Sequence, residues 1–187
     1  MRTERSPTVS TTSTVRETTR RHAFVPTSLG DLLVVAEDDA VVGDFFPGHW
    51  YPPAAADTGE RVEEDDDELI SATAAQVREY LAGQRVTFDV PLRTSGDAFS
   101  EQVWARLRQI PYGTTTTYGA IATELGNRAL AQRVGQAVGH NPLSIVVPCH
   151  RVVGSDGSLT GFAGGLERKR ALLALEEPAD VQASRLF

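Results

Sequence analysis

The chain has 187 residues, a length that fits one domain or two small ones. Apolar residues make up 41% of it, which is enough for a folded core, and no apolar run approaches the roughly 20 residues of a membrane-spanning helix, so no membrane partner is expected. The single cysteine, Cys149, excludes an internal disulfide, a multi-cysteine zinc site and a Cys-x-x-Cys redox pair. A lone thiol is typical of a reducing compartment, and we expect a cytoplasmic protein.

The formal net charge of −7 argues against a nucleic-acid partner only if the charge is evenly spread, and it is not. Residues 22–94 hold 15 acidic and 4 basic side chains, and 8 of the acids lie within residues 57–68. Residues 95–187 hold 9 basic and 8 acidic side chains. The negative net charge therefore comes mainly from one loop, residues 57–68, which we interpret as a solvated surface. It says little about the partners of the C-terminal half.

Polar segments are expected to flank the folded part of the chain. Residues 1–21 contain 10 Ser or Thr and almost no apolar residues, so they cannot offset the entropy of ordering, and we predict a disordered tail. The segment lacks the apolar stretch of a secretory signal, so no such signal is expected. A second tail is expected at residues 179–187.

Residues 22–94 are expected to form a small N-terminal α/β domain. Two apolar runs, 29–36 and 40–46, flank a short acidic segment and predict a β-hairpin. Apolar side chains recur at helical spacing over residues 68–81, which predicts a helix. Apolar and polar side chains alternate over residues 86–90, which predicts a further strand. None of these elements carries candidate chemistry of its own.

Residues 95–178 are expected to form a mainly helical domain. Asp97 is placed to cap a first helix, and Thr117 to cap a second that covers residues 118–125. After a Gly-Asn turn, a third helix is predicted over about residues 129–139. Two short helices joined by such a turn outline a helix-turn-helix, a DNA-binding motif that supports this function only weakly when it stands alone.

The most informative segment surrounds the cysteine. Residues 145–147 are apolar and predict a buried strand that ends at Pro148, so Cys149 and His150 fall on the turn that follows. A lone cysteine is often a small buried hydrophobic residue. Here an adjacent imidazole and the neighbouring Arg151 can supply thiolate character, which favours a reactive thiol. For His150, a histidine that only completes the turn is the alternative.

Residues 148–152, Pro-Cys-His-Arg-Val, resemble the active-site signature of the O6-alkylguanine-DNA alkyltransferases, also called methylated-DNA–protein-cysteine methyltransferases. The resemblance extends over residues 97–176, in which further motifs of that family occur in the same order. These are Pro-Tyr-Gly at 111–113, Tyr-Gly at 118–119, Val-Gly at 134–135, Asn-Pro at 141–142, Gly-Phe-Ala-Gly-Gly-Leu at 161–166, and Lys169, Leu172, Leu173 and Glu176. The N-terminal half is similar only in carrying a small α/β domain.

The resemblance implies direct-reversal DNA repair with no cofactor and no metal. Cys149 would take an alkyl group, typically methyl, from O6-alkylguanine in a flipped-out base, in a single irreversible turnover; O4-alkylthymine is a second candidate substrate. His150 would draw the thiol proton through a water, and Glu176 would orient His150. Asn141 would hold the turn that joins the recognition helix to the active-site segment. Tyr118 would donate a proton towards guanine N3.

The resemblance also implies a base pocket and a DNA-binding surface, with double-stranded DNA that contains O6-alkylguanine as the partner and a monomer as the simplest state. The pocket residues are Val152, Phe162, Ala163 and Gly164. The DNA-binding residues are Tyr118, Gly119, Asn127, Gln132, Arg133, Gly135 and Arg151. Family members carry an arginine two positions before the Val-Gly pair; here Gln132 occupies that position and Arg133 follows, so the sequence leaves open which of them fills the vacated base stack.

Other functions are weighed against this one. An alkyltransferase-like protein would bind the lesion without chemistry, but such proteins replace the cysteine that is present here. A helix-turn-helix regulator with a redox cysteine would be expected to have a resolving cysteine, and the chain has only one cysteine. A cysteine hydrolase would need an oxyanion hole, to which no motif in the sequence points.

Overall fold

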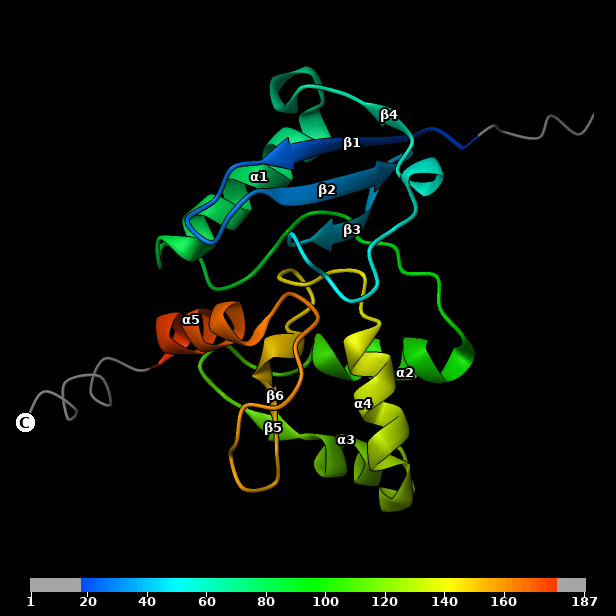
Figure 1. Ribbon diagram of the computed structural model, residues 1–187, viewed down its shortest axis with the longest axis vertical. Helices are drawn as coiled ribbons and strands as arrows, with labels where there is room; N and C mark the ends of the chain where they lie inside the picture. Colours follow the sequence, from blue (N-terminus) through cyan, green and yellow to red (C-terminus); the bar gives the residue numbers. More distant parts are fainter. Residues whose placement is uncertain (1–17, 178–187) are drawn as a thin grey trace, which may run out of the picture.

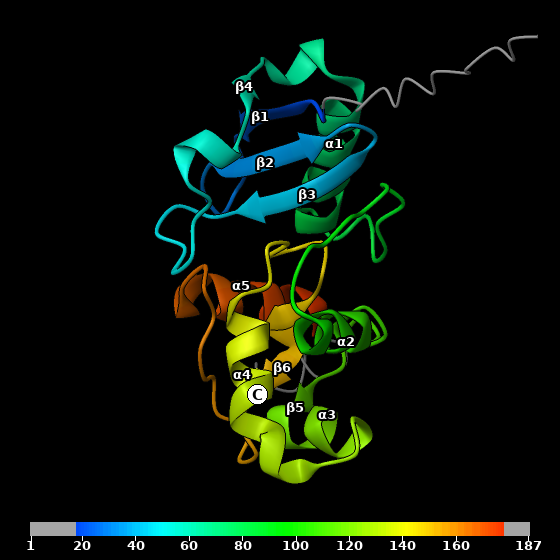
Figure 2. The same cartoon turned by 90° about the vertical axis from the view of Figure 1, so that its right-hand side faces the viewer.

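The computed structural model describes residues 18–177. The chain forms two stacked units, a sheet covered by one helix and a mainly helical unit beneath it (Figure 1). The view in Figure 2 separates the same two units, with the sheet at one end and most of the helices at the other. This arrangement confirms the predicted fold class. Within residues 18–177, no helix is long and apolar enough to cross a bilayer.

The N-terminal unit contains a sheet of four strands: β1 (Arg20–Val25), β2 (Leu32–Glu37), β3 (Ala40–Phe45) and β4 (Glu60–Arg61). They lie in the order β3-β2-β1-β4, with β4 parallel to β1 and the other pairs antiparallel. The predicted hairpin is confirmed as β2 and β3, and its turn places Asp38 at a φ of 53°. Two 3-10 helices follow in the acidic loop, η1 (Ala55–Asp57) and η2 (Glu64–Asp66).

Strand β1 begins within the predicted N-terminal tail. Arg20 and Arg21 pair with β2, so the prediction of a disordered tail is wrong for these two residues. Their side chains explain the difference, since the guanidinium of Arg20 forms an ion pair with Glu37 on the neighbouring strand. Residues 1–17 of the predicted N-terminal tail, and the whole of the predicted C-terminal tail, lie outside the residues that the structure describes.

Helix α1 (Glu68–Leu81) packs against the sheet and confirms the helix predicted there. Asp67 caps its first turn by accepting a hydrogen bond from the backbone N–H of Ile70 at 2.9 Å. Gly83 follows the helix at a φ of 72°, a conformation that favours glycine and ends the helix. The buried face of α1 includes Tyr80, whose hydroxyl reaches the C-terminal unit.

Residues 86–90 do not form the strand that their alternation predicts. Only Leu92, just beyond them, pairs with the sheet, through an isolated bridge to Val41. The backbone N–H of Asp89 is taken by a side chain instead, since it donates to Oε1 of Gln76 at 2.8 Å. A backbone group that a side chain has satisfied is not free for a sheet ladder, so the strand prediction is wrong.

The C-terminal unit is mainly helical. The predicted caps of its first two helices are observed: Asp97 accepts from the N–H of Ser100 at 2.7 Å and Thr117 from that of Ala120 at 3.1 Å. Gly126, at a φ of 93°, lies in the turn of the predicted helical pair, whose members pack together. The elements are α2 (Ala98–Leu107), β5 (Thr116–Thr117), α3 (Tyr118–Glu124), η3 (Arg128–Leu130), α4 (Ala131–Gly139), η4 (Cys149–Arg151), β6 (Val152–Val153) and α5 (Leu166–Glu176).

Residues 145–147 are buried as predicted, but they form a turn and not a strand. The side-chain amide of Asn141 donates to carbonyl oxygens on both sides of this turn, at 2.8 and 2.9 Å. From the N-terminal unit, the carboxylate of Asp44 on β3 accepts from the N–H of Ile145 at 2.8 Å. These partners take the backbone groups that a ladder would need, so the strand prediction is wrong here too.

One apolar core runs through both units. Buried side chains of the sheet and of α1 belong to the same cluster as those of α2, α3 and α4. Contact is close at Gly164, where an added Cβ would lie 2.9 Å from the ring of Phe46 on the loop after β3. Only glycine therefore lets the loop before α5 approach the N-terminal unit this closely. The segment that carries Cys149 lies at this boundary between the units.

Candidate active site

Cys149 begins the short helix η4 and is almost buried, with 5% of its surface exposed. Its Sγ lies 3.8 Å from the carbonyl oxygen of Ser144, to which the thiol donates. Burial raises the pKa of the Cys149 thiol to about 11, against a partly compensating hydrogen bond from Asn141. A thiol with this pKa is protonated at neutral pH, so its use as a nucleophile requires a nearby base.

His150, the next residue, is fully buried and hydrogen-bonded to Glu176 on α5, with 2.9 Å between Nε2 and Oε1. Burial lowers the pKa of His150, and the carboxylate opposes this shift. Because Nε2 faces a carboxylate, we assign the ring proton to Nε2, which leaves Nδ1 as the basic nitrogen. Nδ1 is buried and has no hydrogen-bond partner among the residues that the structure describes. Cys149 and His150 are adjacent but share no direct hydrogen bond.

Glu176 is the centre of a buried network that joins the two units. Burial alone would raise the pKa of this carboxyl group, but hydrogen bonds from His150 and Arg151 outweigh it and lower the pKa to about 2. The Tyr80 hydroxyl donates to Oε1 at 2.6 Å, and the backbone N–H of Gly113 donates to Oε2 at 3.2 Å. Glu176 is therefore an ionised carboxylate with both oxygens satisfied, a rigid support for His150.

Arg151, a predicted DNA contact, has its side chain directed into the protein. Its side chain is buried, and its Nε donates to Oε2 of Glu176 at 2.8 Å while Nη2 donates to Oε1 at 2.8 Å. Nη1 donates to the carbonyl oxygen of Ile110 at 2.5 Å. Each of the three guanidinium nitrogens therefore donates a hydrogen bond inside the protein. Arg151 is the counter-ion of Glu176.

Two residues of the N-terminal unit take part in the site, although the sequence predicted no chemistry there. Tyr80 donates to Glu176 and lies 3.3 Å from Nε2 of His150. Asp44 accepts from the N–H groups of Ile145 and Val146, at 2.8 and 3.3 Å, and so holds the turn that precedes Cys149. A signal for Asp44 was present, since it is an acid within the apolar run 40–46; Tyr80 looked like an ordinary core residue of a helix.

Asp44 gives a testable pH dependence of stability. Burial raises its pKa from 3.8 to about 7, against hydrogen bonds from the backbone of Ile145 and Val146. A raised folded-state pKa stabilises the fold below the unfolded pKa, and this contribution is lost as the pH rises through 7. In urea unfolding, we expect the free energy of unfolding of the parent, relative to Asp44→Asn, to fall between pH 4 and 7 by about 1.4 kcal/mol for each rise of one in pH. Asp31→Asn, an exposed control, should leave the slope unchanged, and a parallel course of parent and Asp44→Asn would contradict the assignment.

Lys169 on α5 is fully buried and connects the two sides of the site. Its Nζ donates to the carbonyl oxygens of Val152, Thr160 and Gly161, at 2.6, 2.7 and 3.0 Å. Burial lowers the pKa of Lys169 to about 8, and its charge lowers the pKa of Cys149. The ammonium therefore fixes the loop that leads into the predicted pocket residues. All four predicted pocket residues are buried: Val152, Phe162, Ala163 and Gly164.

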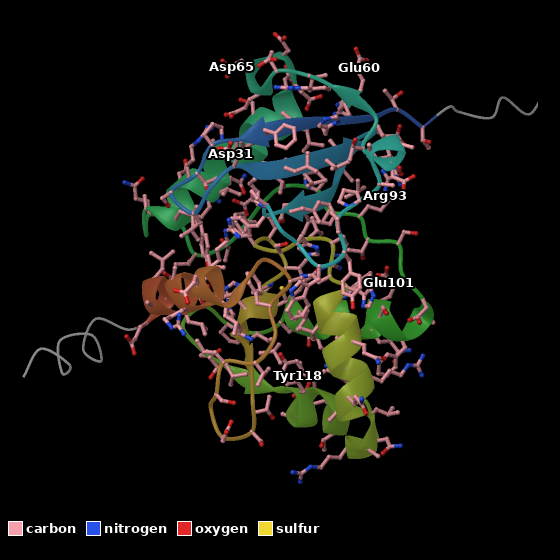
Figure 3. All side chains as sticks on the ribbon, in the orientation of Figure 1. Asp31, Glu60, Asp65, Arg93, Glu101 and Tyr118 are labelled. Atoms are coloured by element: carbon pink, nitrogen blue, oxygen red, sulfur yellow. The ribbon has the colours of Figure 1, made fainter. Side chains whose placement is uncertain are left out.

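Tyr118 is the first residue of α3. Its hydroxyl donates to the carbonyl oxygen of Thr160 at 3.1 Å. Burial raises the pKa of this phenol, the hydrogen bond to Thr160 opposes that shift, and the negative charge of a Cys149 thiolate would raise the pKa further. A Cβ added to Gly135 on α4 would lie 3.7 Å from the Tyr118 ring. Helices α3 and α4 thus contact the site through Tyr118, which lies in the C-terminal unit (Figure 3).

The other predicted DNA contacts lie on α3, α4 and the turn between them. Gly119 occupies the first turn of α3, and the side chain of Asn127 caps η3. Gln132 and Arg133 are both exposed on α4, but the guanidinium of Arg133 lies 4.1 Å from the ring centroid of Phe99, towards α2. Gln132 lies three residues before Gly135, the glycine that faces Tyr118. This spacing places Gln132 and Gly135 on the same face of the helix.

Known protein families match nearly all of the residues that the structure describes. A family model described as "6-O-methylguanine DNA methyltransferase, DNA binding domain" matches residues 98–178, and one described as "6-O-methylguanine DNA methyltransferase, ribonuclease-like domain" matches residues 21–94. A methylated-DNA–protein-cysteine methyltransferase of Mycobacterium bovis is 45% identical over 136 residues, which cover 71% of this chain and 74% of that protein. A methylated-DNA–protein-cysteine methyltransferase of Haemophilus influenzae is 36% identical over 157 residues, which cover 83% of this chain and 86% of that protein. The crystal structure of Mycobacterium tuberculosis OGT in complex with DNA has a TM-score of 0.75 at 36% identity, covering 86% of this chain and 97% of that one.

Proposed function

Because the chain belongs to the 6-O-methylguanine DNA methyltransferase family, we propose that it repairs double-stranded DNA by moving the alkyl group of O6-alkylguanine onto Cys149. The observation that carries the proposal is the arrangement of Cys149 beside a buried imidazole whose Nε2 is bound to an ionised carboxylate and whose Nδ1 has no protein partner. This is the arrangement of nucleophile, base and orienting group that activates a thiol. The thioether product is stable, so each molecule acts once.

The geometry supports the following order of events. Nδ1 of His150 takes the thiol proton through an intervening water, since the two side chains share no direct hydrogen bond. The sulfur attacks the alkyl carbon, so that a C–S bond forms as the bond from carbon to guanine O6 breaks. The leaving guanine anion gains a proton at N3 from the Tyr118 hydroxyl, which turns from Thr160 for this purpose. Glu176 stabilises the imidazolium that has formed.

The sulfur is buried, so the damaged base must leave the duplex to reach it. We assign the base pocket to Val152, Phe162, Ala163 and Gly164, whose loop is anchored by Lys169. Helix α4 would lie in the minor groove, with its small residues permitting close approach. Gln132 is the candidate to fill the vacated stack because Arg133 is engaged with α2. The remaining contacts are assigned to Gly119, Asn127 and Gly135.

We also propose a division of labour along the chain. Residues 95–178 would form the DNA-binding alkyltransferase domain and residues 22–94 the N-terminal α/β domain, a division that the two family matches support. A site in the cytoplasm would keep the single thiol reduced and reactive.

The test is to incubate the protein with a duplex that contains O6-methylguanine and to weigh it by mass spectrometry. We expect a gain of one methyl group, located on Cys149 by peptide mapping and abolished in Cys149→Ser. Tight binding of the methylated duplex without a mass gain would instead indicate a lesion-binding protein. Absence of any preference for the methylated duplex would favour a regulator or a hydrolase.

Replacing Tyr80 with phenylalanine tests the link between the N-terminal unit and the base. Loss of the hydroxyl removes a donor from Glu176, so the carboxylate becomes more basic and the pKa of His150 rises. We expect the acid limb of the single-turnover rate profile to move to higher pH and the rate at pH 7 to fall several-fold. Tyr112→Phe is the matched control, because that hydroxyl donates to the carbonyl oxygen of Leu175 and not to Glu176. An unchanged profile in Tyr80→Phe would remove Tyr80 from the site.

A further inference from the structure

Two exposed aromatic side chains follow β3, on the side of the N-terminal unit that meets the active site. Trp50 is 56% exposed and Tyr51 is 49% exposed, values that are unusual for such large rings. Both belong to the loop that joins β3 to the acidic segment. The proposed reaction leaves this pair of rings unexplained.

The loop is fixed to both sides of the site. The backbone N–H of Trp50 donates to the carbonyl oxygen of Ala163, a proposed pocket residue, at 3.1 Å. The ring of Tyr51 stacks on His140 at the end of α4, with centroids 3.7 Å apart and an angle of 20° between the planes. The rings are therefore presented in a defined position before any partner arrives, which lowers the entropy cost of binding.

The indole of Trp50 reaches the residues that surround the reacting centre. A Cβ added to Gly161 would lie 3.5 Å from Cη2 of Trp50 and 4.0 Å from the hydroxyl oxygen of Tyr118. Trp50 and Tyr118 thus flank the same glycine, and that glycine directly precedes the pocket residues Phe162 and Ala163. The exposed indole therefore lies beside Tyr118 and the loop that carries the proposed pocket residues.

The charge of the loop is compatible with a polyanion. No Asp, Glu, Lys or Arg occurs between Asp44 and Asp57, although the N-terminal unit is otherwise strongly acidic. The three acidic side chains of this unit that Figure 3 labels, Asp31, Glu60 and Asp65, lie on the part of the unit away from Tyr118. The longest stretch of the unit without Asp, Glu, Lys or Arg is therefore the one that adjoins the site, where acidic side chains would repel a phosphate backbone.

We propose that Trp50 is a substrate-binding residue contributed by the N-terminal unit, and that its indole packs against the extruded nucleotide at the mouth of the pocket. Flat aromatic rings bind unstacked bases in this way without regard to sequence. The inference rests on the proposed function, since it requires that a base leaves the duplex. It makes the N-terminal unit part of lesion recognition as well as a support for the catalytic network.

The test compares Trp50→Ala and Trp50→Phe, each in a Cys149→Ser background so that binding can be measured without transfer. Alanine keeps the N–H that bonds to Ala163, so the variant removes the ring and not the anchor of the loop. We expect Trp50→Ala to weaken binding of a duplex with O6-methylguanine about tenfold, and binding of the unmodified duplex much less. Trp50→Phe should retain most of the affinity. Phe24→Ala, which removes an equally exposed ring from β1, is the control and should bind as the parent does.

Fluorescence gives an independent readout. The sequence contains only one other tryptophan, the buried Trp104, so the difference between the emission of the parent and of Trp50→Phe isolates Trp50. We expect this emission to be quenched by the methylated duplex. Equal affinities of Trp50→Ala and the parent for the methylated duplex, or equal weakening with both duplexes, would overturn the proposal. Methyl uptake by the unmutated protein separates the two questions, because its absence would instead refute the proposed function.

Discussion

Replacing Glu176 with glutamine is expected to cost about 3–5 kcal/mol of unfolding free energy, the range found when one partner of a buried ion pair is removed. The carboxylate neutralises Arg151 and holds His150 at 2.9 Å, and a glutamine amide would turn an N–H group towards donors that already point at this position. The same change should lower the single-turnover rate of methyl transfer at least about a hundredfold, because the base loses the group that orients it.

The pH dependence distinguishes this role from a general loss of packing. The folded-state pKa of Glu176 is lowered from 4.5 to about 2, so its contribution to stability is present above pH 4.5 and is lost as the pH falls towards 2. Urea unfolding should therefore show the gap between parent and Glu176→Gln closing over that range. Glu167→Gln is the control, since its partner is Arg170 on the exposed face of the same helix. A Glu176→Gln protein with the parent's stability and rate would refute the network.

The centre of the site could be predicted from the sequence because its residues belong to motifs. Cys149 and His150 are neighbours, and the family resemblance placed Glu176 with them; the structure puts the carboxylate on the imidazole. Tyr80 could not be found in this way. It is 70 residues from His150 in sequence, and a tyrosine on the buried face of a helix carries no local sign that its hydroxyl bonds outside its own unit.

The wrong predictions have a common physical cause. The pattern of apolar residues reports burial, and both segments predicted as strands, 86–90 and 145–147, contain buried side chains. It does not report which groups take the backbone N–H and C=O, and here those partners are the side chains of Gln76, Asp44 and Asn141. The ion pair of Arg151 with Glu176 could not be predicted for the same reason, because Glu176 comes from a helix that is distant in sequence.

The second large effect is expected for Lys169→Met, which replaces a buried ammonium by an apolar side chain of similar length. Three carbonyl oxygens, of Val152, Thr160 and Gly161, lose their donor, and an unsatisfied buried acceptor costs about 1–3 kcal/mol. The removal of a buried charge offsets part of this loss. We expect a net decrease of about 3 kcal/mol in the unfolding free energy, measured in urea.

A loss of stability would be expected for the replacement of any buried hydrogen-bonding group. The reactivity of the Cys149 thiol therefore supplies a second measurement that is specific to the charge of Lys169. The ammonium lowers the pKa of Cys149, and in Lys169→Met this pKa should rise further above its value of about 11. Alkylation of the folded protein by iodoacetamide should then be slower at every pH up to that pKa, even in conditions where the variant is fully folded. Arg170→Met alters the exposed neighbour on α5 and should change neither the stability nor the thiol. If the Lys169→Met protein is less stable but its thiol reacts as the parent's does, Lys169 is a structural anchor of the pocket loop and has no electrostatic part in activating the sulfur.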